Sequence, residues 1–581
     1  MDFIYMLKKL IAYSGKEKWK IFVYSIMHII SIVATVAQPM VFAMIINTLQ
    51  YQNNNMMEKV VFWLFIYVAC FYVFEIFHRS ARFIELYVAY DVKKRYVLKT
   101  YNLLQSLPLG WHNEHHSGNI VSRVNKASDA LYCFGQSMYN YIMTIVNFVG
   151  SIIVLWFISP VVAIIAVFVG LILVFSTKRI YNLSVPEYRM LNEGFHKISA
   201  TLQDGIGNIT TIILLRLGKC IGYDLETKFK DNFIHLVNEN KFTQIKCHVY
   251  SLLVMLLNVG LIFYYIYDKT KNGNIVMLGL VTAIFQYLSQ LMEAFGFYVG
   301  DYEKVIHWRN DFDSVLSIID LSNNIAYMET RQIPLKWNKL LIRTVDFSYD
   351  NSEIVLHNLQ ICLEKGKKIA FVGDSGSGKS TMLKIIRGIY DVPNCNVIVD
   401  DNYKYELKSL TNITTLIPQE PEIFDNTVLY NINMGIKSTD ADIQRVLWQS
   451  AFDEVIEKLP KGVNSLINEN GVNLSGGEKQ RLALARGLFS VKDSSIVLFD
   501  EPTGSLDAAT ELKVYTRVFE SLSDRCVISV LHRLHLLKLF DYIYVFHNGD
   551  IVEHGELDNL INNKGYFTYL WEKYMLEQSA M

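Results

Sequence analysis

The chain has 581 residues, of which 51% are hydrophobic and only 19% charged. A soluble protein of this size carries about 25% charged residues, so the composition disfavours an entirely soluble protein and indicates membrane spans. The net charge of −1 excludes a strongly basic nucleic-acid-binding protein, and seven scattered cysteines without a C-x-x-C pair argue against a disulfide framework and a structural zinc site.

The first predicted element, residues 1–17, is an interfacial helix on the cytoplasmic leaflet. Phe3, Ile4, Leu7 and Ile11 recur at helical spacing and give one apolar face. A frayed terminus is the alternative. The first long apolar run lacks a small-residue cleavage site and is long enough to span a bilayer, so we expect no cleavable signal peptide.

Six apolar runs follow, and each approaches the about 20 residues that a membrane-spanning helix needs. They lie at 21–46, 60–78, 139–158, 161–176, 249–267 and 275–297. Short connections alternate with two long polar segments that have a helical pattern and hold most of the lysines and arginines of the first half of the chain. The positive-inside rule then places the N-terminus and both long segments in the cytoplasm. We predict a multi-pass, all-α, six-helix transmembrane domain over residues 18–319.

A polar stretch at 320–337 indicates a linker, and residues 338–581 show strands alternating with helices, which is typical of an α/β domain. Within it, Gly-Asp-Ser-Gly-Ser-Gly-Lys-Ser at 373–380 fits the P-loop pattern between a strand and a helix. Glycines let backbone N–H groups surround a phosphate, and the following helix directs its positive end at the same anion. Lys379 is expected to reach the β- and γ-phosphates and Ser380 to hold Mg²⁺.

A second apolar run, at 495–499, precedes Asp500 and Glu501. Consecutive apolar residues indicate a buried parallel strand. Asp500 at its carboxyl end would bind Mg²⁺, and Glu501 would polarise the water that attacks the γ-phosphate. By itself the pattern fits equally well an ordinary strand that ends in a charged turn. The P-loop upstream favours the catalytic interpretation.

The sequence Leu-Ser-Gly-Gly-Glu at 474–478 resembles the L-S-G-G-Q signature of ATP-binding cassette (ABC) proteins, with Glu478 in place of the glutamine. Ser475 and the two glycines form another phosphate-sized nest at a helix N-terminus. The resemblance implies that this nest closes on the ATP held by the P-loop of a partner domain.

The resemblance extends over the second half of the chain and implies further roles. Tyr349 matches the aromatic residue that stacks on adenine, and Gln419 matches the Q-loop glutamine, which touches Mg²⁺ and the attacking water. Glu469 matches a cross-linking loop that is typical of exporters. Asp507 ends the Gly-Ser-Leu-Asp of the D-loop, and His532 matches the switch histidine that contacts the γ-phosphate.

The resemblance therefore implies a complete ATP site with Mg²⁺. Its members are catalytic Glu501, His532, Gln419 and Lys379, ATP contacts from Tyr349, Gly373, Ser375, Gly376, Ser377, Gly378, Lys379, Ser380, Thr381, Gln419, Ser475, Gly476, Gly477 and Asp507, and metal ligands Ser380, Gln419 and Asp500. The segments at 393–396 and 400–402 depart from the Gly-containing turns of the family, although Asn and Asp tolerate the same backbone conformation.

The first half resembles ABC exporters in which a six-span domain precedes the cassette. Residues 111–118 and 202–218 look like the two coupling regions of that family. His112, His115 and His116 have no obvious fourth ligand, which favours coupling contacts over a metal site. One P-loop and one signature per chain imply a dimer, with two-fold symmetry as the default. The intact motifs favour a homodimer, and a heterodimer with a degenerate partner stays open.

Together these patterns predict an ATP-driven half-transporter in a bacterial cell membrane that exports an amphipathic or hydrophobic cargo, such as a peptide, a drug-like molecule or a lipid. The alternatives are a lipid flippase and an ATP-gated channel or sensor that does not pump. Polar residues within spans are costly and indicate either cargo contacts or interhelical hydrogen bonds. In or near the predicted spans they are His28, Gln38, Glu75, Gln286, Gln290 and Glu293. Of these, Glu75 and Glu293 would suit cationic or amphipathic cargo.

Overall fold

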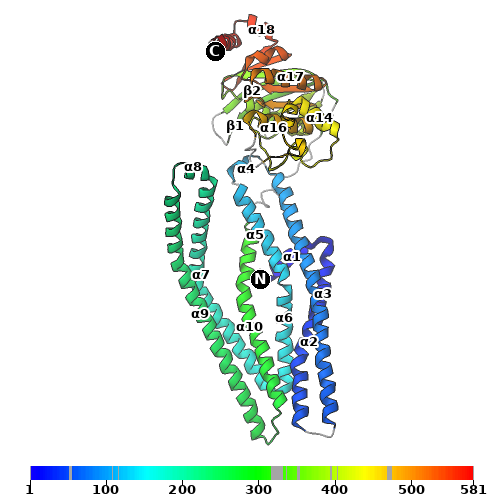
Figure 1. The fold of residues 1–581 in the computed structure, drawn as a ribbon, viewed down its shortest axis with the longest axis vertical. Helices are drawn as coiled ribbons and strands as arrows, with labels where there is room; N and C mark the ends of the chain where they lie inside the picture. The colour runs from blue at the N-terminus through cyan, green and yellow to red at the C-terminus, as the bar shows by residue number, and fades with distance from the viewer. Residues whose placement is uncertain are drawn as a thin grey trace. The chain divides into compact units, whose positions relative to one another are not determined.

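The chain forms two compact units, a helical unit of residues 1–107 and 111–326 and an α/β unit of residues 327–581 to which residues 108–110 also belong (Figure 1). The computed structural model describes residues 2–51, 55–107, 109–115, 117–315, 332–334, 336–349, 354–390, 392, 395–401, 403–467 and 474–579. A helical unit followed by an α/β unit is the order that the sequence predicts. Most of the predicted linker at 320–337 lies outside the described residues, and the predicted domain boundaries stay predictions.

Helices, most of them long, make up the described chain before residue 327. Their bounds are α1 (Asp2–Ser14), α2 (Lys18–Gln50), α3 (Met56–Gln105), α4 (Leu109–Glu114), α5 (Ser117–Gln136), α6 (Met138–Ile158), α7 (Pro160–Gly207), α8 (Ile209–Leu214), α9 (Gly218–Lys271) and α10 (Leu278–Asp313), with the 3₁₀ turn η1 (Gly15–Glu17) between α1 and α2. Pro160 occupies the first turn of α7, where the missing N–H costs nothing. Each predicted span lies within one helix, except that α10 begins three residues after the predicted start at 275.

Four helical stretches of the described chain are long and apolar enough to cross a membrane: Asp2–Gln50, Met56–Gln105, Ile120–Ile158 and Gly218–Lys271. Pro160–Ser176 is a shorter apolar helix. These stretches contain five of the six predicted spans. The sixth lies in α10, whose apolar run is interrupted by Gln286, Gln290 and Glu293.

The described N-terminus is a helix rather than a frayed end. Met6 and Leu10 of α1 are fully buried against a cluster that includes Phe134 and Phe312. The Tyr5 hydroxyl donates a hydrogen bond of 2.6 Å to Asp313 Oδ1 at the end of α10. These contacts fix α1 to the helical unit, while its predicted place at the membrane surface stays a prediction.

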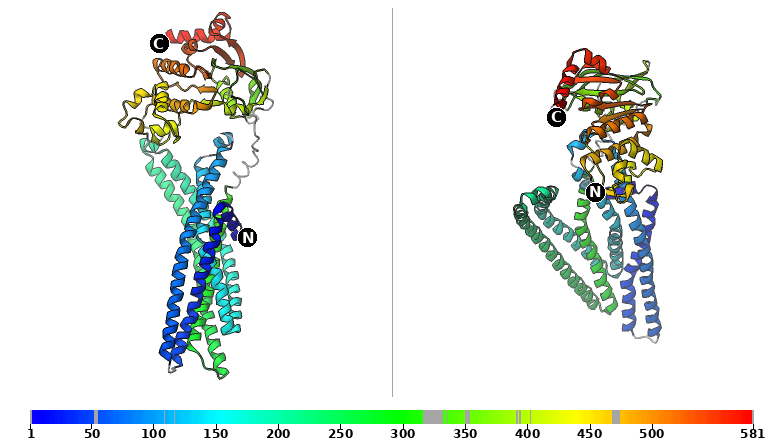
Figure 2. Two further views of the ribbon diagram at one scale, coloured as in Figure 1. Left: turned by 90° about the vertical axis from the view of Figure 1, so that its right-hand side faces the viewer. Right: turned by 45° about the horizontal axis from the view of Figure 1, so that its top comes forward.

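A hairpin of α7 and α9, closed by α8, extends from the other helices (Figure 1). At the end away from α8, both helices pack against α10 in a core that includes Leu173, Leu261 and Ile284. Toward α8 the pair diverges from the remaining helices, as Figure 2 shows from two further directions. In that half of the hairpin, α7 and α9 pack on each other and leave their outer faces uncovered.

The α/β unit contains strands and helices in alternation. The strands are β1 (Lys339–Ser348), β2 (Ile354–Glu364), β3 (Lys368–Gly373), β4 (Asn396–Val399), β5 (Tyr403–Glu406), β6 (Thr414–Ile417), β7 (Asn426–Thr427), β8 (Leu466–Ile467), β9 (Ile496–Asp500), β10 (Cys526–Val530), β11 (Tyr542–His547) and β12 (Asp550–Gly555). The α-helices are α12 (Lys379–Ile386), α13 (Val428–Asn433), α14 (Asp440–Gln449), α15 (Asp453–Ile456), α16 (Gly476–Ser490), α17 (Ala508–Ser521), α18 (Leu557–Asn562) and α19 (Tyr566–Ser579), and the 3₁₀ turns are η2 (Leu407–Asn412), η3 (Gly462–Asn464), η5 (Val491–Asp493) and η6 (Leu534–Leu539).

The principal sheet has the strand order β12-β11-β3-β10-β9-β6, beside a four-stranded sheet of order β2-β1-β4-β5. The strands β11, β3, β10, β9 and β6 run parallel, and β12 is antiparallel at the edge. Parallel strands end at the same edge of a sheet, so Gly373, Ile417, Asp500 and Val530 lie along one edge. The site is built on this edge.

Both faces of β3 and β9 are buried, which explains their continuous apolar sequences. Ala370 and Val372 of β3 face a core that also holds α16 and α17, whereas Ile369 and Phe371 face a second core with α12. This alternation follows from the two-residue period of a strand. Two packed cores therefore hold the carboxyl ends of these strands in place.

Candidate nucleotide-hydrolysis site

The P-loop leaves the carboxyl end of β3 and leads into α12. Gly373, Gly376 and Gly378 have positive φ angles of 144°, 81° and 99°, which L-residues with a Cβ rarely adopt. A Cβ on Gly373 would lie 2.1 Å from the carbonyl oxygen of Phe546. The loop thus depends on glycine for both its backbone conformation and its close approach to β11.

Lys379 is buried at the start of α12. Its Nζ donates hydrogen bonds to the carbonyl oxygens of Gly373 (2.9 Å) and Asp374 (2.6 Å). Burial lowers the pKa of Lys379, while the nearby carboxylates of Glu501, Asp374 and Asp500 oppose that shift. The ammonium group therefore lies within the phosphate-binding loop, where it can bind the phosphate oxygens of a nucleotide.

Ser380 and Asp500 provide adjacent oxygen atoms for a divalent cation. The Ser380 hydroxyl donates to Asp500 Oδ1 at 2.6 Å across the space between α12 and β9. Burial raises the pKa of Asp500, although the hydrogen bond from Ser380 favours the carboxylate. A hydroxyl and a carboxylate are hard oxygen donors of the kind that Mg²⁺ prefers, so these residues fit the ion. Bound there, Mg²⁺ would neutralise charge on the β- and γ-phosphates.

Glu501 follows β9 directly, and its carboxylate lies between two other predicted residues. Gln419 Nε2 donates to Glu501 Oε2 at 3.2 Å, and His532 Nε2 contacts Glu501 Oε1. Glu501 adopts a left-handed backbone conformation with φ of 49°, which is strained for a residue with a Cβ. Gln419 follows β6 and His532 follows β10, so the ends of three neighbouring strands bring this trio together.

Tyr349 lies beside the helix that follows the P-loop. Its hydroxyl is 2.9 Å from Thr381 Oγ1, and its ring contacts Phe347 and Tyr390 edge to face. The residue as a whole is 36% exposed, which leaves surface that a planar base can reach. The structure thus places two predicted ATP contacts, Tyr349 and Thr381, against each other.

The signature segment forms a second candidate anion-binding nest, at the start of α16. Ser475 is the N-cap of this helix and accepts a hydrogen bond from the Glu478 N–H (3.3 Å), while Glu478 Oε2 accepts one from the Ser475 N–H (2.8 Å). This reciprocal pair is a capping box. The backbone hydrogen bond from Ser475 holds the pKa of Glu478 below its usual value.

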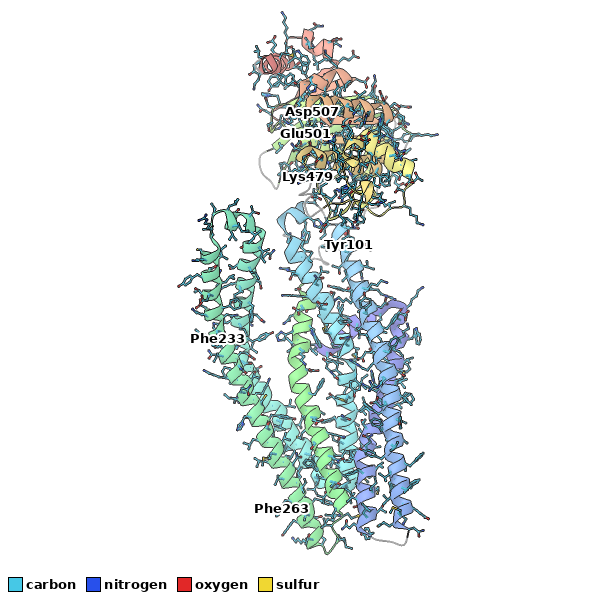
Figure 3. All side chains as sticks on the ribbon, viewed as in Figure 1. Tyr101, Phe233, Phe263, Lys479, Glu501 and Asp507 are labelled. Atoms are coloured by element: carbon cyan, nitrogen blue, oxygen red, sulfur yellow. The ribbon has the colours of Figure 1, made fainter. Side chains whose placement is uncertain are left out.

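A cavity of about 460 Å³ opens beside this nest. Ser475, Gly476 and Gly477 line it together with Asp507, which caps α17 by accepting a hydrogen bond of 2.9 Å from the Thr510 N–H. Figure 3 shows Asp507 and Glu501 on the α/β unit. None of the described P-loop residues lines this cavity. The two nests of one chain are therefore separate surfaces.

One set of contacts at the P-loop has no signal in the sequence. The Tyr566 hydroxyl of α19 donates a hydrogen bond to Asp374 Oδ2 across 192 residues of chain, and His547 Nδ1 lies 3.6 Å from the same oxygen. Burial and this carboxylate raise the pKa of Tyr566 to about 12. An isolated aromatic residue near the C-terminus carries no pattern that predicts such a contact.

Two sequence predictions concern residues that the structure does not describe. Glu469 of the cross-linking loop and His116 of the first coupling region lie outside the described residues. His112 and His115 are described, and each has a ring nitrogen within hydrogen-bonding distance of a backbone carbonyl, at 3.0 Å from Leu104 O and 2.8 Å from Trp111 O.

Comparison with known proteins gives two family matches. Residues 21–295 match the ABC transporter transmembrane region, and residues 356–504 match the family described as ABC transporter. The chain is 25% identical to an ATP-dependent lipid A-core flippase of Pectobacterium atrosepticum over 81% of each chain. It is 26% identical to the mitochondrial iron-sulfur clusters transporter ATM1 of Kluyveromyces lactis, over 83% of this chain and 68% of that protein.

The fold also matches a solved structure, that of a bacterial Atm1-family ABC exporter with ATP bound. The TM-score is 0.81, with coverage of 96% of this chain and 98% of the other. The sequence identity between the two is 21%, so this likeness concerns the fold.

Proposed function

The chain belongs to the ABC transporter family as an exporter-type half-transporter that couples ATP hydrolysis to transport, and we propose that two identical copies form the working unit. The predicted fold class and multi-pass membrane nature agree with these matches. The observation that carries the proposal is the separation of the P-loop and the Ser475 nest on one chain. A second copy, related by a two-fold axis, can bring each nest onto the ATP held by the other chain.

The exposed apolar surface of the α7–α9 hairpin is a second observation in favour of a partner chain. Apolar side chains of α8 and of the adjoining part of α9 are largely exposed, among them Leu214 (75%) at the tip and Phe233 (60%) further along α9, the latter labelled in Figure 3. This half of the hairpin belongs to the segment that the positive-inside rule places in the cytoplasm, where exposed apolar surface of this extent marks an interaction site. Because the ATPase motifs are intact, we favour an identical partner over a degenerate one.

In the proposed ATP site, the γ-phosphate lies near Lys379 and the carboxyl ends of β9 and β10. Glu501 accepts a proton from the attacking water, and Gln419 and His532 hold its carboxylate in place. His532 also contacts the γ-phosphate as hydrolysis proceeds. Lys379 stabilises charge that develops on the phosphate oxygens, and Ser380, Asp500 and Gln419 would hold Mg²⁺.

Alternating access then links this chemistry to transport. ATP binding closes the two α/β units on each other and moves the transmembrane helices from an inward-facing to an outward-facing arrangement, and hydrolysis resets them. The cargo is an amphipathic or hydrophobic molecule moved out of the cytoplasm or the inner leaflet of a bacterial cell membrane, with the N-terminus and the ATPase unit in the cytoplasm. A lipid flippase is the second candidate, favoured by the similarity to a relative named a lipid A-core flippase.

The test uses the full-length protein reconstituted in lipid vesicles, with Glu501→Gln as the variant. Loss of the general base should abolish steady-state ATP hydrolysis, a drop of roughly 100-fold or more, while ATP binding persists. Turnover at the normal rate in this variant would refute the assigned base. ATP-driven accumulation of cargo supports a pump, whereas ion conductance that continues without hydrolysis once opened would show a channel instead. Single-chain sedimentation of the active protein would refute the dimer.

A further inference from the structure

A cavity of about 380 Å³ lies within the helical unit, between α2, α3 and α10. Its size is at the lower end of the roughly 300–1,000 Å³ of small-molecule sites. Phe42, Tyr67 and Phe285 give it aromatic walls, and Gln38, Gln286 and Gln290 give it side-chain amides. Such a mixture of aromatic surface and few polar groups is typical of a binding site for an organic molecule.

The amides of Gln38 and Gln286 have no partner within the described chain, and both side chains are half-buried. Other polar groups of the lining do have partners: the Ser289 hydroxyl donates to the Phe285 carbonyl of its own helix, and Gln290 Oε1 accepts a hydrogen bond of 3.4 Å from Ser151. Leaving an amide unpaired in a membrane interior is costly. Among the described residues of this chain, interhelical hydrogen bonding therefore accounts for Gln290 but not for Gln38 or Gln286.

Pro39, which lines the same cavity, interrupts the backbone hydrogen bonding of α2. It lies inside α2 and has no N–H, so it cannot donate the helical hydrogen bond to the carbonyl oxygen of Thr35. Both residues line the cavity. The glutamine amides thus supply hydrogen-bond donors and acceptors beside the cavity. The proline leaves the carbonyl oxygen of Thr35 without its usual helical donor.

The lining contains no charged side chain among its described residues. Glu75, which the sequence suggested as a contact for cationic cargo, forms an ion pair with Arg79 one turn along α3. Glu293 is exposed and continues the face of α10 that carries Gln286 and Gln290, but it lies outside the cavity lining. A cation bound here would have aromatic faces but no carboxylate within the lining.

We propose that this cavity binds an uncharged amphipathic cargo through its amide groups, and that Gln38 and Gln286 select such cargo by hydrogen bonding while Phe42, Tyr67 and Phe285 pack against its apolar part. An apolar peptide segment without charged ends has this chemistry. The inference rests on the proposed export function and narrows its substrate class, because it disfavours the cationic cargo that Glu75 and Glu293 suggested.

The test compares two probes that differ only in N-terminal acetylation: acetyl-Leu-Phe-amide, which is neutral, and Leu-Phe-amide, whose free amine is cationic. Each is added to the full-length protein in lipid nanodiscs, and ATPase stimulation is measured relative to the basal rate of the same preparation. A diazirine-bearing neutral probe gives a second readout, in which mass spectrometry identifies the labelled peptides. The variants are Gln38→Leu and Gln286→Leu, with Thr282→Val as control, since the Thr282 hydroxyl bonds to Gly279 O of its own helix and is absent from the lining.

We expect the neutral probe to stimulate hydrolysis more strongly than the cationic one and to label α2 and α10. Each glutamine variant should raise its half-maximal concentration by about 2- to 10-fold, the value of one hydrogen bond, while Thr282→Val leaves it unchanged. Equal or stronger action of the cationic probe, no action of the neutral probe in either readout, or glutamine variants that behave like the control would overturn the inference. Labelling of α2 and α10 without any ATPase activity would instead count against the proposed function and support the site.

Discussion

Glu478→Gln tests whether the Ser475 nest receives a phosphate group. The glutamate takes the place of the family glutamine within the first turn of α16, and its lowered pKa keeps it ionised at neutral pH. If the γ-phosphate of the partner's ATP binds at this nest, Glu478 repels it. Two negative charges on the phosphate at about 8 Å from the carboxylate give roughly 1 kcal/mol of repulsion in water. Screening at 0.15 M salt reduces this to about 0.4 kcal/mol.

The substitution should therefore lower the ATP concentration for half-maximal hydrolysis, by about 5-fold at low salt and about 2-fold at 0.15 M salt. The introduced glutamine side chain would still accept the hydrogen bond from the Ser475 N–H, so the capping box loses only its charge. That loss should cost about 0.3–1 kcal/mol of helix stability. The same variant should therefore show a lower half-saturating ATP concentration and a slightly lower melting temperature.

The assay is ATP-dependent hydrolysis by the reconstituted full-length protein at two salt concentrations, with a melting curve of the same samples. Glu520→Gln, which changes an exposed glutamate in the last turn of α17, is the matched control. An unchanged half-saturating ATP concentration at low salt would refute the reasoning. So would a decrease that salt does not affect, because the proposed repulsion is electrostatic.

Three further outcomes are expected. Acidification should raise the Mg²⁺ concentration needed for hydrolysis, because protons compete with the ion for Asp500, and the raised pKa of this carboxyl moves the effect to a higher pH than for an ordinary carboxylate. In Asp500→Asn, the Mg²⁺ concentration needed for any remaining hydrolysis should depend less on pH. Tyr566→Phe should raise the KM for ATP about 2- to 5-fold, because the Asp374 carboxylate loses its hydrogen bond and repels the phosphates. If Tyr566→Phe has the same effect on KM in an Asp374→Ala background, this explanation is contradicted. Gly373→Ala should abolish ATP binding and lower the melting temperature, whereas Gly376→Ala, whose added Cβ meets no atom within 4 Å, should be milder; binding titration and thermal denaturation measure both.

The sequence predicts best what depends on neighbouring residues. The P-loop between a strand and a helix, the helix N-terminus at Ser475 and the buried strand before Asp500 are local patterns, and the structure contains each of them where expected. Helices are less well delimited: the apolar run at 21–46 lies within the longer helix Lys18–Gln50, because helical structure continues into the polar flanks while hydrophobicity stops at the membrane.

Features that depend on tertiary structure were less accessible. Gln419, Glu501 and His532 meet because β6, β9 and β10 are neighbours, and family resemblance rather than periodicity suggested that arrangement. The Tyr566–Asp374 contact joins residues 192 positions apart and has no sequence signal. Likewise, the sequence could not decide which glutamines of the spans bond to other helices and which face a cavity.

The left-handed backbone conformation of Glu501 implies a trade-off between the proposed catalytic function of this residue and the stability of the fold. An L-residue in this conformation costs roughly 1–2 kcal/mol relative to glycine, and the neighbouring strands hold it there. A chain selected only for thermal stability would replace Glu501 with glycine, and would thereby lose the carboxylate between Gln419 and His532. Stabilising consensus design should therefore leave this position untouched, and a gain in melting temperature from Glu501→Gly would be a sign of inactivation rather than improvement.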